Sequence, residues 1–290
     1  GNIASGPAEV LAFLNGAQIS EGGYTVFGLP SRSRQGTANI TVSIEGLKNR
    51  VDFREAVDYV VTEFGVASLK GLTLRERAQA LVEIAHPDDR VELIAAAKRE
   101  NILYRDQIYL AESARCYPSQ IKERQLFKGN IEIRFRPIRP SDEEEMRQLF
   151  YRFSDESVYY RYFSSLKAMP HTRMQTYVNV DWNDVMSIVG VIGKPRHGSI
   201  VAEARYLVDP DGGWAEIAFV VDESYQRIGI STYVFKLLVR LAKERGVKGF
   251  WADVLVSNTA MMKVFNKSGL PVHTEMEGGV YHVRIPFDLP

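Results

Sequence analysis

The stretch from Trp214 to Gly246 places the tightest limit on how this chain can fold. It opens with an apolar, β-rich run over 215–221, passes through a short polar turn, and ends in a helical pattern. The helix is indicated by apolar residues at helical spacing, namely Val234, Leu237, Leu238 and Leu241. A strand that feeds a helix through a turn leaves free backbone N–H groups at the positive end of the helix dipole. The stretch therefore predicts an anion site that suits a phosphate.

The turn itself carries a motif. It reads Gln226, Arg227, Ile228, Gly229, Ile230, Ser231, and it resembles the acetyl-CoA motif of the GNAT acetyltransferases, Gln/Arg-x-x-Gly-x-Gly/Ala. In that family the amides of this loop hold the CoA pyrophosphate, so the resemblance implies that these six residues bind the cofactor. Gly229 lets the backbone come close to a ligand, whereas Ser231 stands where Gly or Ala is usual. An ordinary strand-to-helix turn is the alternative interpretation.

A second segment supports the first. Residues 258–270 resemble the later GNAT motif, Asn-x-x-Ala…Leu-Tyr-x-Lys-x-Gly-Phe, and the predicted element order over 131–287 is also that of the family. The resemblance implies a GNAT fold with a central mixed β-sheet over 129–290, with acetyl-CoA or CoA as cosubstrate. Asn258 either caps the following helix or touches the cofactor arm. Phe265 stands where many members have a tyrosine that protonates the leaving thiolate, so a water takes that role or no donor is required.

Glu216 is the predicted catalytic residue. It lies on the strand before the phosphate loop, where apolar neighbours would raise its pKa and let it take a proton from an attacking amine. The run AEIAFVV, followed by YQRIGIS, resembles the bacterial protein-lysine acetyltransferases of the Pat type, in which the glutamate at this position is the general base. The resemblance also implies that backbone groups of Phe219, Val220 and Val221 hold the pantetheine arm as an added strand would be held. A solvated edge-strand residue is the alternative for Glu216.

The amino-terminal third resembles another family, the carboxy-terminal domain of the acetyl-CoA hydrolases/transferases. The similar segments are Gly16–Ser31, Val57–Gly71, Glu76–Ala78 and Ile84–Arg90. The resemblance implies an incomplete α/β domain over 1–103. In that family the catalytic glutamate precedes a glycine-rich turn, which would fall here at residues 1–6. We therefore expect the chain to be a fragment of a longer protein with at most half of a transferase site.

Local patterns fill in this α/β segment. Strands are predicted over 24–29, 40–44 and 56–62, and a capping box at Thr73 predicts a helix. Glu63 is either a replacement nucleophile or a strand-end carboxylate with a local hydrogen bond, and the second is favoured.

Two further stretches are less regular, one between the domains and one within the second. Residues 104–128 are highly charged, and we predict a partly helical connector that ends near Gly129. The aromatic run over 159–163 either lines an acceptor groove or packs in the core.

Composition excludes several classes of function. The 36 basic and 36 acidic residues cancel, which argues against broad binding to nucleic acid or to an anionic membrane. Cys116 is the single cysteine, which fits a reducing cytoplasm. No apolar run reaches membrane-spanning length. The five histidines lack metal-ligand spacing, and we predict no metal.

Three functional hypotheses remain open. The first is an acetyl-CoA-dependent N-acetyltransferase acting on an amine, with a protein lysine as one candidate acceptor. The second assigns CoA-transferase or acyl-CoA hydrolase activity to a full-length parent. In the third, the GNAT domain is a non-catalytic CoA sensor that regulates its attached enzyme. The acyl length is open, and an oligomer is compatible with the sequence.

Overall fold

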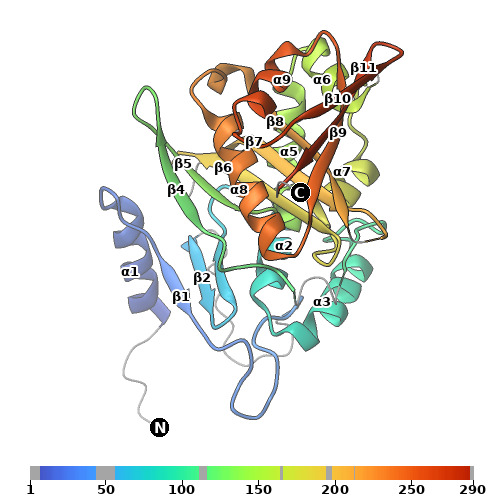
Figure 1. Ribbon diagram of the computed structural model, residues 1–290. Helices are drawn as coiled ribbons and strands as arrows, with labels where there is room; N and C mark the ends of the chain where they lie inside the picture. The colour runs from blue at the N-terminus through green and yellow to red at the C-terminus, as the bar shows by residue number, and fades with distance from the viewer. Residues whose placement is uncertain are drawn as a thin grey trace. The chain divides into compact units, whose positions relative to one another are not determined.

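The computed structural model describes residues 7–43, 56–110, 116–163, 166–193, 198–211 and 213–287. The chain divides into two compact units, Gly1–Ala111 and Glu112–Pro290 (Figure 1). Both units combine helices with β-strands, and the predicted α/β fold class is confirmed.

The described residues of the first unit form a small sheet and three helices. Its elements are α1 (Pro7–Ile19), β1 (Val26–Gly28), β2 (Tyr59–Thr62), β3 (Gly65–Ser68), α2 (Leu74–Ile84) and α3 (Pro87–Arg99). The strand order is β1-β2-β3, with β1 parallel to β2 and β3 antiparallel to it. The predicted capping box opens α2, because the Thr73 hydroxyl accepts from the Glu76 N–H and the Glu76 carboxylate accepts from the Thr73 N–H.

The structure differs from the sequence prediction at several points in this unit. The strand expected over 56–62 begins only at Tyr59. Residues 40–43 form no strand, and Ile44 and the predicted turn at 1–6 lie outside the described residues. The favoured interpretation of Glu63 is confirmed, since its carboxylate accepts from the Ser31 N–H at 2.9 Å and from the Ser31 hydroxyl at 2.5 Å. These hydrogen bonds lower the pKa of Glu63.

The second unit is built on an eight-stranded sheet. Its strands are β4 (Glu123–Phe127), β5 (Ile131–Pro137), β6 (Val185–Ile192), β7 (Ser199–Val208), β8 (Trp214–Val221), β9 (Gly249–Leu255), β10 (His273–Glu277) and β11 (Val280–Pro286). They lie in the order β10-β11-β9-β8-β7-β6-β5-β4. Only the β8–β9 pair is parallel, so the sheet is mixed, as predicted.

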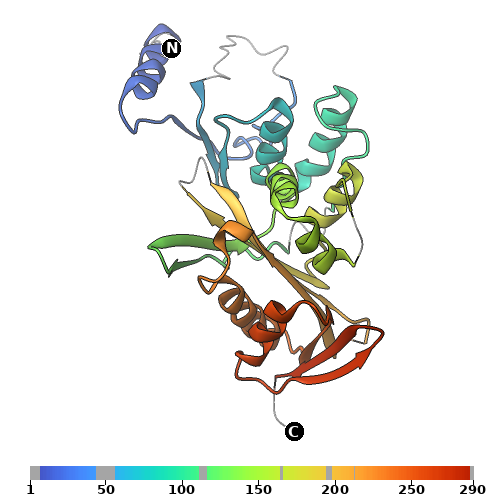
Figure 2. The same cartoon turned by 90° about the horizontal axis from the view of Figure 1, so that it is seen from above.

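Helices cover both faces of this sheet (Figures 1 and 2). They are α5 (Glu143–Arg152), α6 (Asp155–Tyr162), α7 (His171–Val178), α8 (Ile230–Glu244) and α9 (Thr259–Asn266), with short 3₁₀ turns at Pro140–Asp142 and Glu223–Tyr225. On the α8 and α9 face, the ring of Phe219 in β8 meets those of Phe235 and Phe265. On the α5–α7 face, Tyr177 of α7 donates to the carboxylate of Glu203 in β7 at 2.7 Å.

The strand alternation of β8 sends its side chains to these two faces in turn. Ile217, Phe219 and Val221 are buried on the α8 side, whereas Glu216 on the opposite face is exposed. The apolar face of α8 packs into the same core through Val234, Phe235, Leu238 and Ala242, all nearly inaccessible to solvent. The strand and helix that the sequence linked through its phosphate turn are therefore packed directly on one another.

Two strands of the second unit were missed from the sequence, as was β3 in the first unit. Residues 123–127 were expected to lie in a partly helical connector, but they form β4 and pair along their whole length with β5. β10 was also missed, because all five of its residues are exposed and polar residues predominate. The available signal in both cases was the hairpin turn: Gly129 and Asn130, and Gly278 and Gly279, all have positive φ.

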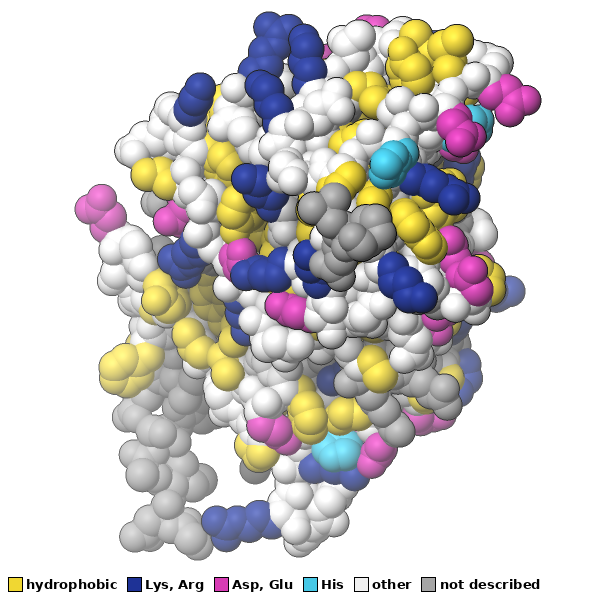
Figure 3. All heavy atoms as spheres, viewed as in Figure 1, with side chains coloured by type: hydrophobic (Ala, Val, Ile, Leu, Met, Phe, Trp, Pro, Cys, Tyr) yellow, Lys and Arg dark blue, Asp and Glu magenta, His cyan; other side chains and the backbone are white. Residues whose placement is uncertain are grey.

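Basic, acidic and apolar side chains are interspersed over the face shown in Figure 3. Among the residues that the structure describes, no helix is both long enough and apolar enough to cross a bilayer.

Candidate active site

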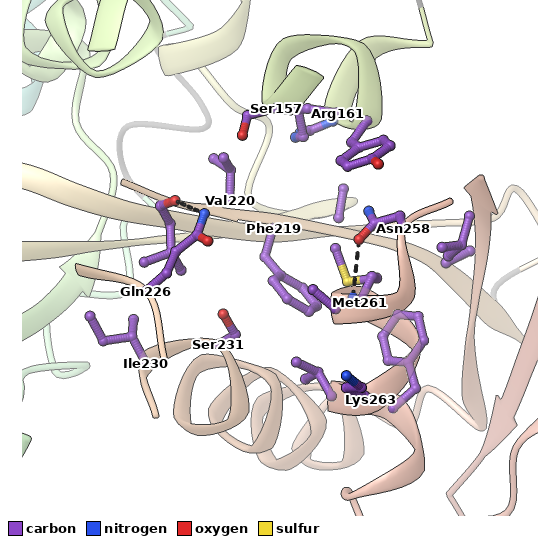
Figure 4. A pocket seen from close by; sticks show the side chains of 18 of the residues that line it. Ser157, Arg161, Phe219, Val220, Gln226, Ile230, Ser231, Asn258, Met261 and Lys263 are labelled. Carbon is purple, nitrogen blue, oxygen red and sulfur yellow. Dashed lines mark hydrogen bonds between the residues drawn. The ribbon is translucent and has the colours of Figure 1, made fainter. Parts of the chain in front are cut away.

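A cavity of about 1150 Å³ lies in the second unit, between α6, β8, the turn that precedes α8, β9 and α9 (Figure 4). Single small-molecule sites usually enclose about 300–1,000 Å³. The cavity is therefore large enough for an extended cosubstrate together with part of an acceptor.

The cavity opens where β8 and β9 separate. The two strands pair only over Trp214–Glu216 and Gly249–Trp251, although β8 continues to Val221 and β9 to Leu255. Beyond Glu216, the edge of β8 that faces β9 carries backbone N–H and C=O groups that this ladder does not use. Such an edge accepts an extended, amide-bearing chain as an added strand.

The turn before α8 forms the other end of the cavity. Gly229 is the N-cap of α8, with φ 106° and ψ 1°, and it provides no side-chain cap. The first amides of α8 are thus left without an intrahelical acceptor and lie at the positive end of the dipole. A Cβ built on Gly229 would meet nothing nearer than the Phe127 ring at 3.9 Å, so the glycine is required by its backbone conformation rather than by lack of space.

Local hydrogen bonds fix the approach to this turn. The Gln226 side-chain amide donates to the carbonyl of Val221 at 3.2 Å, and so spans the turn that links β8 to α8 (Figure 4). Asp222 is buried, caps the following 3₁₀ turn through the Ser224 N–H, and pairs with Arg152 at 2.7 Å. Arg227 adopts φ 63°, a conformation that few non-glycine residues take.

Glu216 lies at the point where the strands separate. Its side chain lines the cavity, and in the described part of the chain it takes part in no hydrogen bond or ion pair. Partial burial raises the pKa of Glu216, the charges of Asp253 and Asp209 act in the same direction, and Arg161 opposes them. A carboxylate with these properties suits a general base.

The structure brings the predicted site residues together, with one exception. The members that line the cavity are Glu216, Phe219, Val220, Val221, Gln226, Arg227, Gly229, Ile230, Ser231, Asn258 and Phe265. Ile228 does not line it, and packs instead against the core. Asn258 caps α9, since its Oδ1 accepts from the Met261 N–H at 3.1 Å, and its side-chain nitrogen is directed away from that contact (Figure 4).

Phe265 forms an apolar wall. Its ring is 1% exposed and lies against the rings of Phe219 and Phe235. Since it has no hydroxyl, it offers no proton to a leaving group.

The sequence predicted only part of the cavity wall that α6 forms opposite β8. Of the aromatic run over 159–163, Tyr160, Arg161 and Phe163 line the cavity, which fits the acceptor-groove interpretation. Ser157 on the same helix was missed, and so were Asp253 on β9 and Lys263 on α9. None of these three residues is a signature residue of a recognisable sequence motif, and they are identified only by their position in the folded cavity.

Arg161 is held in this wall by a buried network. Its guanidinium donates to the Tyr177 hydroxyl at 2.8 Å and lies 4.0 Å from Glu203. Glu203 is fully buried, and it also accepts from Arg205 at 2.6 Å and from Ser187 at 2.9 Å. Burial raises the pKa of Glu203, but the two arginines and the Tyr177 hydrogen bond outweigh it and lower the pKa overall. The network therefore stays ionised and contributes one arginine to the cavity.

The described residues contain no group of three or more histidine, cysteine, aspartate or glutamate side chains suited to hold a metal ion.

Comparison with known proteins identifies both units. Residues 1–97 match the family model of the acetyl-CoA hydrolase/transferase C-terminal domain, and residues 142–270 match that of the acetyltransferase (GNAT) family. The strands β6 to β9, the separation of β8 from β9 and the turn before α8 all lie within the residues that match the GNAT acetyltransferase family.

The relatives divide in the same way. The 4-hydroxybutyrate coenzyme A transferase of Clostridium kluyveri is 43% identical over 96 residues, which are 33% of this chain and 22% of that protein. The acetyltransferase Pat of Mycolicibacterium smegmatis is 32% identical over 135 residues, 46% of this chain and 40% of that protein. The crystal structure of the GNAT domain of S. lividans PAT is 27% identical, with a TM-score of 0.54 over 59% of this chain and 99% of that one.

The chain thus carries an acetyl-CoA hydrolase/transferase C-terminal domain followed by a GNAT acetyltransferase domain, and the second domain is similar to that of the Pat acetyltransferases. The chain spans less than half the length of either curated relative.

Proposed function

We propose that the second unit transfers the acetyl group of acetyl-CoA to an amine. The observation that carries the proposal is Glu216, a carboxylate of raised pKa that lies in the cavity at the point where β8 and β9 separate. The residues present fit acetyl-CoA, because the free amides at the start of α8 suit its pyrophosphate and the open edge of β8 suits its amide-bearing arm.

The proposed reaction follows from this placement. Acetyl-CoA supplies an activated acetyl group. The uncharged acceptor nitrogen forms the new C–N bond at the thioester carbonyl, and Glu216 accepts the proton of that nitrogen, directly or through a water. The C–S bond breaks, and its electron pair leaves on the sulfur. Because Phe265 has no proton to give, the sulfur leaves as a thiolate or is protonated by water.

We propose a protein lysine as the acceptor, on the resemblance of the β8 segment and its turn to the Pat-type enzymes. The α6 wall with Ser157 and Arg161 would then contact the residues that flank the lysine. We also propose a cytoplasmic location, because one cysteine in 290 residues fits a reducing compartment.

Glu216→Gln tests the proposal. We expect the rate of acetyl transfer to lysine-bearing peptides to fall by about 10²–10⁴-fold, because the amide of the new side chain accepts no proton. The rate is measured by the release of the free CoA thiol. The affinity for acetyl-CoA, measured by calorimetry, should be unchanged because the loop amides are untouched. Equal turnover by the variant and the wild type would remove Glu216 as the base.

Two other functions give different results in the same experiment. A CoA sensor binds acetyl-CoA but acetylates no peptide, in the wild type as in the variant. The match of residues 1–97 favours a further CoA-transferase or hydrolase activity for a longer parent protein, and Glu216→Gln should leave that activity unchanged.

A further inference from the structure

A strand outside the range matched by the GNAT family packs against the helix that begins at the cofactor turn. β4 (Glu123–Phe127) precedes the matched residues 142–270. It lies at the edge of the sheet and pairs with β5. Its side chains nevertheless contact the first turns of α8, where the proposed pyrophosphate site lies.

A polar contact joins the first residue of β4 to two turns of α8. The Tyr233 hydroxyl donates to Glu123 Oε2 at 2.6 Å, and the Arg240 guanidinium donates to Glu123 Oε1. Burial raises the pKa of Glu123, but these two hydrogen bonds and the charge of Arg240 outweigh it and lower the pKa. Burial and the bond to Glu123 raise the pKa of Tyr233. The carboxylate thus stays ionised and the phenol stays protonated, which is the pairing that gives a strong charge-assisted hydrogen bond.

An apolar contact joins the last residue of β4 to the same turn. The Phe127 ring meets the Tyr233 ring edge-on at 5.7 Å between centroids, and Tyr233 in turn lies 4.8 Å from the Phe135 ring. Phe127 is also the residue nearest to the position that a Cβ on Gly229 would take. The Tyr233 N–H donates to the Gly229 carbonyl at 3.1 Å, so Tyr233 links β4 directly to the cofactor turn.

We propose that β4 is a buttress for the cofactor turn, and that Glu123 and Tyr233 are positioning residues that set the affinity for the pyrophosphate of CoA. The proposal rests on the proposed function of the 226–231 turn. Amides bind an anion well only when they already point at it, because ordering them on binding costs free energy. Contacts that fix the first turn of α8 reduce this cost without touching the ligand.

The test measures two ligands on the full chain by calorimetry. The first is ADP, which carries the pyrophosphate, and the second is S-acetylpantetheine, which lacks it. We expect Glu123→Gln and Tyr233→Phe each to weaken ADP and acetyl-CoA binding about 3–10-fold, and to leave S-acetylpantetheine binding and the kcat at saturating acetyl-CoA unchanged. The double variant should bind ADP no more weakly than the more affected single variant, because both substitutions remove the same hydrogen bond between Tyr233 and Glu123.

Glu132→Gln is the matched control. It removes a carboxylate from the same hairpin, but Glu132 is exposed on β5, opposite Leu126. It should bind all three ligands as the wild type does.

The outcomes separate this inference from the proposed function. If Glu123→Gln binds ADP with wild-type affinity, the proposed role of β4 is wrong. It is also wrong if the variant loses affinity for ADP and for S-acetylpantetheine equally, which would indicate general loosening of the fold. A wild-type chain that binds no acetyl-CoA overturns the proposed function and the inference with it.

Discussion

Glu216 is surrounded by charges that act in opposite directions. Asp253 on β9 and Asp209 after β7 add to the effect of burial and raise its pKa, while Arg161 on α6 lowers it. A base with a raised pKa loses activity as the pH falls through that pKa. We therefore expect the acid limb of the kcat/KM profile to lie above the ordinary range of a glutamate, about 4.3.

Arg161→Met should move this acid limb to higher pH. Removing the cation leaves burial and the two aspartates unopposed, so the pKa of Glu216 rises further. The pH dependence of kcat/KM for acetyl transfer measures the shift.

Tyr177→Phe is the control for Arg161→Met. Tyr177 touches both Arg161 and Glu203 but carries no charge, so its loss disturbs the same network without the electrostatic effect. The acid limb should stay at its wild-type pH in this variant. A common shift in both variants would mean that packing, rather than charge, is responsible.

At the residue scale, the sequence predicted those site residues that lie close together in one continuous segment of the chain. Glu216 and the 226–231 turn lie within one strand–turn–helix segment, so a local motif was enough. Arg161 reaches the same cavity from a helix 55 residues before Glu216, and no local pattern reports such a contact. The motif also gave no sign that the Gln226 side chain donates to the Val221 carbonyl across the turn.

At the scale of the element, α8 depends on the backbone conformation of its N-cap. Gly229 has φ 106°, which costs a residue with a Cβ about 1–3 kcal/mol. Gly229→Ala should therefore shift the turn, and we expect it to lower the free energy of unfolding and to weaken acetyl-CoA binding about tenfold or more.

Gly246→Ala gives the comparison for this effect. Gly246 also has positive φ and open space around it, but it follows the other end of α8. It should lose a similar amount of stability in a denaturant titration and keep its acetyl-CoA affinity. Unchanged affinity in Gly229→Ala would contradict a role for the turn in binding.

β4 and β10 are the two edge strands of the large sheet, and they show why the sequence analysis did not predict such strands. Every residue of β10 is exposed, and the five residues of β4 alternate between exposed and half-buried. Without a buried face neither strand needs an apolar pattern, and only pairing with a neighbour makes it a strand. The inner strand β8 has a buried face, and the sequence predicted it over 215–221, within one residue of its observed bounds.

This difference has a practical test. A fragment cut at the predicted boundary, 129–290, lacks β4 and exposes the edge of β5 together with Phe135 and Tyr233. We expect it to unfold at a lower temperature and to aggregate more readily than a fragment that starts at Glu112. Equal melting temperatures and solubility would show that β4 adds little to the unit.

At the scale of the whole molecule, the chain holds two separate hydrophobic cores, one in each unit. We expect two transitions in a calorimetric thermal scan. A ligand stabilises only the folded unit that binds it, by about 2.7 kcal/mol at a concentration 100 times its Kd. Acetyl-CoA should therefore raise the transition of the second unit alone, which a scan of the fragment from Glu112 would identify.

Glu216→Gln should preserve this shift, because it leaves the proposed pyrophosphate turn intact. A shift confined to the other transition would place acetyl-CoA binding in the first unit.

The separation of β8 from β9 also determines how this sheet exchanges hydrogen with water. Amides of β8 that bond to β7 lie inside a ladder, whereas those beyond Glu216 that face β9 lie outside one. The first group should exchange deuterium slowly and the second quickly, so that protection alternates along a single strand. An extended ligand that pairs with this edge would remove the alternation. The deuterium uptake of residues 217–221 would then report, without any assay of turnover, how much of the protein carries its cosubstrate.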